Sequence, residues 1–189
     1  NLDLTDESTA QANRLGVLLR LGGTTIADYD VTVQVATTSV SVRAAGFVRS
    51  TDGAYQADFD LTTSFNLSGG RVTYRITGSD GTFVYLDVSA GQVSSTIVFQ
   101  VGREGNTIEI AGTDDGQTVT GTIKFNGTTV GTISGPSADP TITGANGRTL
   151  TADQIAALQA IFQAASEFIG NFAEGILGPA SVVFGSVGI

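Results

Sequence analysis

The stretch TLTADQIAALQAIFQAASEFIGNFAEGIL, residues 149–177, is the one long segment of this chain with a helical period. Its apolar residues recur at spacings of three and four, which gathers them on one side of a helix. Thr151 and Gln154 have the spacing of a capping box at its start, and Leu150 and Ile155 that of a hydrophobic staple. We therefore predict a helix over residues 149–177 whose apolar side is covered by the rest of the chain.

The opposite side of this predicted helix carries little charge. Ala156, Ala160 and Ala164 follow one another at a spacing of four residues along it. Such a row is typical of a close-packing surface against a second element or another subunit. Alanine also has the highest helix propensity, so the row has a purely local explanation as well.

Outward from this helix, residues 27–134 change to an alternation of apolar and polar side chains. Val31, Val33 and Val35 begin the pattern, and the run from Tyr55 to Leu67 keeps one parity without a Gly or Pro. Later in the series, Phe83 and Tyr85 are assigned to the apolar set, with a shift of one residue before Val88. Alternation of this kind predicts strands with one buried face.

Short turn signals separate these runs. They are Asp52-Gly53, Ser68-Gly69-Gly70, Asp80-Gly81, Ala90-Gly91, Glu104-Gly105-Asn106, Asp115-Gly116 and Asn126-Gly127. The last pair suits the type I′ turn of a two-residue hairpin. The signals predict an antiparallel meander of eight or nine strands.

The first 23 residues read as a short N-terminal helix. Thr5 is a suitable N-cap, acidic residues follow it, and Gly22-Gly23 would stop the helix. The apolar stripe that supports this reading consists of Ala12, Leu15, Leu18 and Leu19.

Together these patterns predict an α+β, mainly β, single domain over residues 1–189. The meander over residues 27–134 is expected to curl around the long C-terminal amphipathic helix, with the N-terminal helix beside it. Residues 135–148 would form a polar connection to the helix.

The segment ASVVFGSVGI, residues 180–189, is apolar and has no charged side chain. We predict a strand that adds to a sheet edge, either within its own chain or in a neighbouring subunit. The side chains expected to make that contact are Val182, Val183, Phe184, Val187 and Ile189.

Composition excludes several partners and chemistries. A net charge of −9 and the lack of a basic stretch argue against nucleic-acid binding, and no segment is a membrane-spanning apolar run. With no His and no Cys, neither a Ser-His or Cys-His nucleophile nor a His- or Cys-bound metal is possible. We expect no cofactor and no enzymatic activity.

Some of the acidic residues are candidates for hydrolysis or for Ca²⁺ binding. Asp58 and Asp60 lie two residues apart on one strand face, where a hydrolytic pair competes with a solvated face. Asp28 and Asp30, and likewise Asp114-Asp115, have oxygens for Ca²⁺, but turn formation explains aspartate equally well there.

The functional expectation is a non-enzymatic, secreted bacterial structural protein at the cell surface or outside the cell. The start at Asn1 and the absence of oxidisable Cys and Met suit that location. It would be a surface, matrix or filament subunit, a homo-oligomer or polymer assembling through β-strand addition by a terminus. The alternative is a carrier that holds an apolar ligand between a curved sheet and the helix.

Overall fold

The computed structural model describes residues 1–6, 12–145, 151–154 and 156. Almost all of these residues belong to strands. The strands are β1 (Leu2–Asp6), β2 (Asn13–Leu21), β3 (Thr24–Ala36), β4 (Ser39–Arg49), β5 (Gln56–Asn66), β6 (Gly69–Gly78), β7 (Phe83–Gly91), β8 (Ser95–Arg103), β9 (Asn106–Asp114), β10 (Thr118–Phe125), β11 (Thr128–Pro136) and β12 (Thr141–Gly144).

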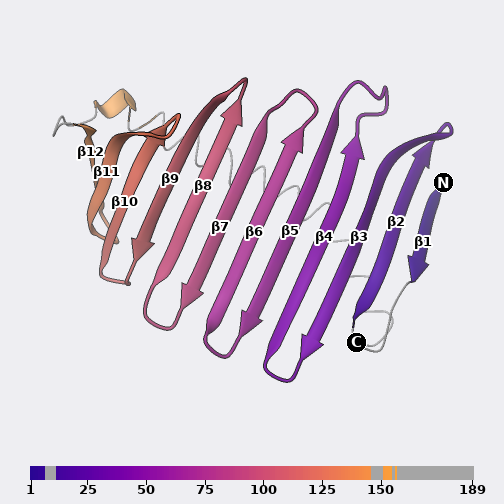
Figure 1. Ribbon diagram of the computed structural model, residues 1–189, viewed down its shortest axis with the longest axis horizontal. Helices are drawn as coiled ribbons and strands as arrows, with labels where there is room; N and C mark the ends of the chain where they lie inside the picture. The colour runs from indigo at the N-terminus through magenta and orange to yellow at the C-terminus, as the bar shows by residue number, and fades with distance from the viewer. Residues whose placement is uncertain (7–11, 146–150, 155, 157–189) are drawn as a thin grey trace.

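All of these strands form one sheet, in which the order in space is the order in the chain. The sheet has twelve strands, and each is antiparallel to its neighbours (Figure 1). A meander of this kind needs only short connections, because consecutive antiparallel strands are joined by hairpins. The predicted turn signals lie at or beside those connections.

The hairpin between β10 and β11 is the clearest case of local sequence fixing a turn. Phe125 pairs with Thr128, so Asn126 and Gly127 alone make the loop. Both have positive φ, +49° and +78°, as a type I′ turn requires. The prediction for this dipeptide is confirmed.

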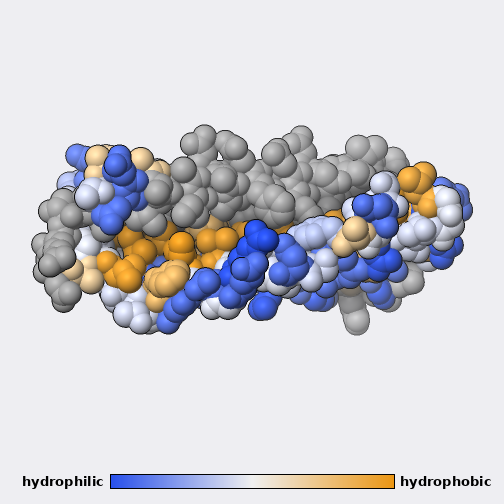
Figure 2. All heavy atoms as spheres, turned by 90° about the horizontal axis from the view of Figure 1, so that it is seen from above, coloured by the Kyte–Doolittle hydropathy of each residue, from blue (hydrophilic) through white to orange (hydrophobic). Residues whose placement is uncertain are grey.

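The two faces of the sheet differ in polarity because side chains alternate along each strand. Figure 2 shows the sheet from above, with hydrophobic residues gathered along one side and hydrophilic residues along the other. We call these the apolar face and the polar face. Val31, Ala44 and Leu61, from β3, β4 and β5, lie on the apolar face with exposed fractions of 1%, 0% and 2%.

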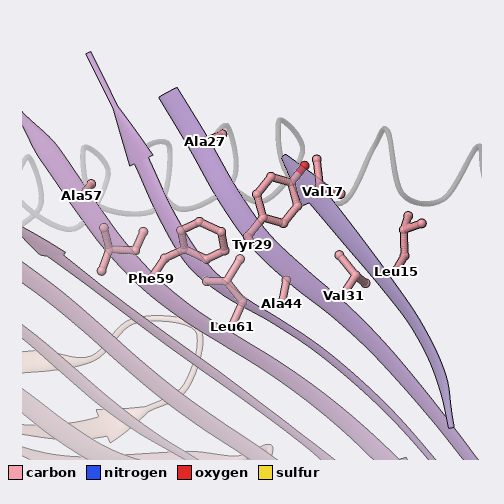
Figure 3. Packing of buried hydrophobic residues seen from close by; sticks show 10 residues of the cluster. Leu15, Val17, Ala27, Tyr29, Val31, Ala44, Ala57, Phe59 and Leu61 are labelled. Carbon is pink, nitrogen blue, oxygen red and sulfur yellow. The ribbon is translucent and has the colours of Figure 1, made fainter. Parts of the chain in front are cut away.

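A cluster of buried residues from β2 to β6 forms the main core on the apolar face (Figure 3). At its centre the rings of Tyr29 and Phe59 meet edge to face, with centroids 5.6 Å apart. Gly46 of β4 lies opposite both of them, between β3 and β5. Because glycine has no side chain, the two rings approach each other across the middle strand.

The predicted α+β fold class is wrong. The described residues form one twelve-stranded sheet with a single short helical stretch, rather than eight or nine strands curled around a long helix. The nine strands β3 to β11 do correspond to the predicted meander of residues 27–134, although β3 begins at Thr24 and β11 ends at Pro136. The other three strands come from segments for which the sequence predicts a helix or a connection.

The predicted N-terminal helix is replaced by β1 and β2. The leucines of this segment fit a helical stripe, but Leu15, Val17 and Leu19 also share one parity. Pairing with β3 places these three on the apolar face and buries Leu15 and Val17. Tertiary pairing therefore overrides the local helical pattern.

At the other end of the sheet, part of the predicted polar connection forms β12. The capping box beyond it is confirmed, since Thr151 N–H donates to Gln154 Oε1 over 2.9 Å and Gln154 N–H to Thr151 Oγ1 over 3.3 Å. Residues 152–154 and 156 are helical. Residues 149, 150, 155 and 157–177 of the predicted helix, and with them the predicted staple of Leu150 and Ile155, lie outside the described part of the chain.

The long uninterrupted strand predicted over residues 55–67 is confirmed as β5, but the face assigned to β7 is wrong. Val84, Leu86 and Val88 lie on the apolar face, opposite Ile76, Tyr74 and Val72 of β6. Phe83 and Tyr85 lie on the polar face. No shift of register is needed within β7, because every second residue from Val84 onward is apolar.

Candidate functional site

The register of the sheet arranges the polar face in rows that cross the strands. One row passes through ten strands, from β3 to β12, and most of its members are hydroxyl residues; we call it the hydroxyl row. Its members, each directly opposite the next, are Gln34, Ser41, Ser64, Arg71, Ser89, Thr96, Thr113, Thr120, Ser134 and Thr141. Ser89 and Thr96 are hydrogen-bonded through their hydroxyls, 2.6 Å apart. Serine and threonine pairs of this kind stabilise neighbouring strands.

Charged residues on the polar face form ion pairs between neighbouring strands. Arg14 contacts Asp30 over 2.7 Å, and Lys124 contacts Glu109 over 2.7 Å. Each of these pairs joins one strand to the next. Pairs that remain partly exposed contribute little to stability, so their main effect is on register and solubility.

Two of the ion pairs are bidentate. Arg43 donates to both oxygens of Asp60 over 2.9 and 2.7 Å, and Arg71 donates to both oxygens of Asp87 over 2.9 and 2.6 Å. The hydrogen bonds from these arginines lower the pKa of each aspartate below its ordinary value. Both carboxyls therefore stay ionised at neutral pH, which is unsuited to a general acid.

The candidate hydrolytic pair does not form a facing pair of acids. Asp58 and Asp60 lie on one face of β5, where Asp58 accepts a hydrogen bond from Gln56 and Asp60 is held by Arg43. A glycosidase-type site needs two carboxyls on either side of a cleft. Along β5, these two have the arrangement of a solvated strand face.

The candidate calcium ligands are engaged in turn and strand contacts. Asp115 accepts the backbone N–H groups of Gln117 and Thr118, which lowers its pKa. Asp114 accepts hydrogen bonds from Gly116 N–H and from the Ser137 hydroxyl. No group of three acidic side chains suited to a metal is found within the part of the chain that the structure describes.

Two hollows lie on the polar face. One, of about 490 Å³, spans β2 to β5 and includes Arg14, Gln34 and Arg43 in its lining. The other, of about 530 Å³, lies over β8 to β10 and includes Thr96, Thr113 and Thr120 of the hydroxyl row. A carrier of apolar ligands would need an enclosed apolar cavity, whereas the second hollow, although Val98 and Ala111 also line it, lies open on the sheet surface.

The two edge strands of the sheet are short. Strand β1 pairs with Leu15 to Leu19 of β2, and β12 pairs with Gly131 to Ser134 of β11. Leu4 on β1 is 48% exposed although its side chain belongs to the apolar face. Within the described residues, the meander therefore ends in two edges on opposite sides of a wide sheet (Figure 1).

The hydrogen-bond pattern shows which residues face outward at each edge. Asn1 and Arg20 exchange both backbone bonds, over 2.7 and 2.8 Å. Hydrogen-bonded and non-hydrogen-bonded pairs alternate along antiparallel strands. The backbone N–H and C=O groups of Asp3 and Thr5 therefore face β2, whereas those of Leu2 and Leu4 point away from it.

The same alternation applies at the opposite edge. Ser137 N–H donates to Gln117 O over 3.0 Å, so the backbone groups of the odd-numbered residues from Gly131 to Gly135 face β10. Thr132 therefore faces β12, where it pairs with Thr143. The backbone groups of Ile142, the residue before Thr143, point away from the sheet.

The predicted assembly residues are mostly outside the described part of the chain. This applies to the tail residues Val182, Val183, Phe184, Val187 and Ile189, and to Ala160 and Ala164 on the second face of the predicted helix. Ala156 is described; it is helical and exposed. Among the helical residues that the structure describes, none forms a helix long and apolar enough to cross a membrane.

The polar-face rows are the feature that sequence reasoning missed. Their members come from strands up to about 100 residues apart, so only the register brings them together. A partial signal was present, because the polar positions of the alternating runs are rich in Thr and Ser.

Comparison of the chain with protein-family models, with curated proteins and with solved structures finds no match in any of the three.

Proposed function

We propose that this protein is a non-enzymatic structural subunit, at the cell surface or in an extracellular matrix, that assembles by β-strand addition at a sheet edge. The observation that carries the proposal is the edge at β1, which among the described strands pairs only with β2, and where Leu4 combines an outward-facing backbone with an exposed apolar side chain. An edge of this kind is a template for a further strand.

The chemistry of the polar face also supports a structural function. The arginine-bound aspartates are ionised partners in cross-strand pairs, and the aspartates of the β9–β10 connection serve its turn. The chain has no His, the commonest general base, and no Cys nucleophile. A wide sheet whose polar face carries hydroxyl groups and ion pairs suits a structural subunit of a surface layer or matrix.

An extracellular location is part of the same proposal. The chain has no Cys and no Met, so it lacks the two side chains that are oxidised most readily. Its net charge of −9 favours solubility at high local concentration, which a surface or matrix subunit would experience.

The edge is tested by comparing Leu4→Pro with Leu4→Ala in sedimentation velocity over a wide concentration range. Proline removes an N–H that faces away from β2, so the internal β1–β2 bonds remain. Alanine keeps that N–H and serves as the matched control. Circular dichroism checks that both variants keep the β-sheet signal.

We expect the wild type and Leu4→Ala to form oligomers as concentration rises. Assembly by Leu4→Pro should need at least about tenfold more protein, because a hydrogen bond is lost and the ring obstructs pairing. A wild type that stays monomeric throughout would overturn the proposal. Equal assembly by the two variants would show that this edge is not used.

A further inference from the structure

We infer that the strand added to β1 is β12 of a second copy, so that the sheets of successive subunits join head to tail. The inference rests on the proposed function and names its partner. It follows from the direction of the edge strands, the face of their outward residues and the charges that each arrangement would bring together.

Strand direction is the first argument. Because the described strands form a meander of twelve, an even number, β1 and β12 run in opposite directions. A second copy placed beside the first by simple translation therefore sets its β1 antiparallel to the first copy's β12. The added pair continues the meander with the stronger, antiparallel pattern of hydrogen bonds.

The faces of the sheets also match in this arrangement. Residues that exchange hydrogen bonds across an antiparallel pair point their side chains to the same face. Leu4 and Ile142 both have outward-facing backbone groups, and both side chains lie on the apolar face, where Leu4 is opposite Val17 and Ile142 opposite Ile133. Joining them keeps the apolar faces of the two copies on one side.

The register that sets Leu4 opposite Ile142 is compatible with the remaining side chains. It sets Asp3 opposite Thr143 and Thr5 opposite Thr141, without opposing two charges. Thr141 is the last member of the hydroxyl row, so Thr5 of the second copy would extend that row. The apolar pair of Leu4 and Ile142 adds a favourable cross-strand contact.

Pairing of like edges is less favourable. Two β1 strands that set Leu2 opposite Leu4 would place Asp3 opposite Asp3 of the second copy, and like charges directly opposite are destabilising. The next register would set Leu4 opposite Leu4, but it would also set Leu2 opposite Asp6 at both ends of the pair, an apolar side chain against a carboxylate. Two β12 strands that set Ile142 opposite Ile142 would pair only Thr141 to Thr143, whereas the β1–β12 register pairs the whole of β12, Thr141 to Gly144.

Because the two edges that meet are different, the contact is heterologous and leaves one edge of each kind at the ends. Assembly should therefore continue beyond a dimer into an open chain. Each edge strand is short, so the contact is expected to be weak and to depend strongly on protein concentration.

The test uses two full-length variants, each with one edge blocked: Leu4→Pro at β1 and Ile142→Pro at β12. Alanine at the same positions is the matched control. Sedimentation velocity is measured for each variant alone and for an equimolar mixture. A head-to-tail contact predicts that each proline variant alone is monomeric at concentrations where the wild type forms dimers and larger species.

The mixture is the decisive sample. One β12 edge in Leu4→Pro and one β1 edge in Ile142→Pro remain usable, so the mixture should form a one-to-one dimer and nothing larger. If Ile142→Pro alone assembles like the wild type, β12 is not the partner of β1, and the head-to-tail inference is overturned while edge assembly stands. If Leu4→Pro alone dimerises, assembly does not need the β1 edge. Both the proposed assembly at β1 and the head-to-tail inference are then overturned.

A third variant lacking residues 180–189 addresses the apolar tail as the competing strand donor. Under the head-to-tail contact, its assembly should equal that of the wild type. Loss of assembly on deletion, together with assembly by Ile142→Pro alone like that of the wild type, would assign the added strand to the tail and overturn the inference. A monomeric wild type would overturn both the inference and the proposed function.

Discussion

Substitution of Gly46 by alanine tests whether the aromatic contact at the centre of the core depends on the missing side chain. Gly46 lies on β4 between Tyr29 and Phe59 and has a φ of +155°. A Cβ built there would fall 2.5 Å from both Cα and Cβ of Tyr29, and closer still to the carbonyl oxygen of Asp28. Real Cβ atoms do not approach backbone this closely.

The cost of Gly46→Ala has two parts. Overpacking of a filled core costs about 1–3 kcal/mol. A backbone conformation that L-residues rarely adopt costs a further amount of about 1–3 kcal/mol. We therefore expect a loss of about 4 kcal/mol in the free energy of unfolding, measured by urea denaturation with circular dichroism.

Gly16→Ala is the matched control, because Gly16 also lies within a strand, opposite Thr5 of β1 and Asp30 of β3. A Cβ at Gly16 would meet Asp30 and Thr5 only at ordinary contact distances, 3.5 and 3.6 Å. We expect a change within about 0.5 kcal/mol of wild type, or a small gain from the reduced freedom of the unfolded chain.

Two results would refute the reasoning on Gly46. The first is a loss below about 1 kcal/mol for Gly46→Ala, which would mean that β4 moves freely enough to accept a side chain. The second is recovery of stability in the double variant Gly46→Ala with Tyr29→Ala. The nearest atom is a backbone carbonyl oxygen, so shortening Tyr29 should leave most of the loss in place.

Three further outcomes follow from the same structure. Leu61→Ala, at a side chain only 2% exposed, should lower the free energy of unfolding by about 3 kcal/mol in urea denaturation; a loss below about 1 kcal/mol would contradict its place in the core. Gly127→Ala should cost only about 1 kcal/mol, because its φ of +78° is strained for alanine although the space is open; a thermal melt no lower than that of wild type would argue against the type I′ turn. Arg71 lowers the pKa of Asp87, so their pair stabilises the fold fully above the unfolded-state pKa of about 3.9, and that contribution is lost as pH falls through the lower folded-state value. In urea midpoints measured across pH, the difference between wild type and Arg71→Gln should therefore shrink below about pH 4, and a difference that stays constant would show that the pair is not its source.

The meander between residues 27 and 134 was predictable because its signals are local. Each turn contains residues such as Asn126-Gly127 that favour a chain reversal, and each strand alternates between apolar and polar side chains. Consecutive antiparallel strands then pair with their neighbours in the chain. The continuous β5 follows from the same reasoning, since no Gly or Pro interrupts it and only Thr63 departs from the apolar set.

The N-terminal segment shows where that reasoning fails. Leu15, Leu18 and Leu19 satisfy a helical stripe, while Leu15, Val17 and Leu19 satisfy a strand equally well. A short apolar run cannot decide between the two periods on its own. Pairing with β3 decides it, because the strand satisfies the backbone hydrogen bonds of both segments and buries Leu15 and Val17.

The sequence by itself determined the turns, most strands and the exclusion of His- and Cys-based chemistry, because these depend on residue type and on spacing over a few positions. Only the tertiary structure decided that the sheet has twelve strands, which residues share a row on the polar face, and which backbone groups point outward at Leu4 and Ile142. Those features depend on register between strands, and register is a property of pairs of segments rather than of either segment alone.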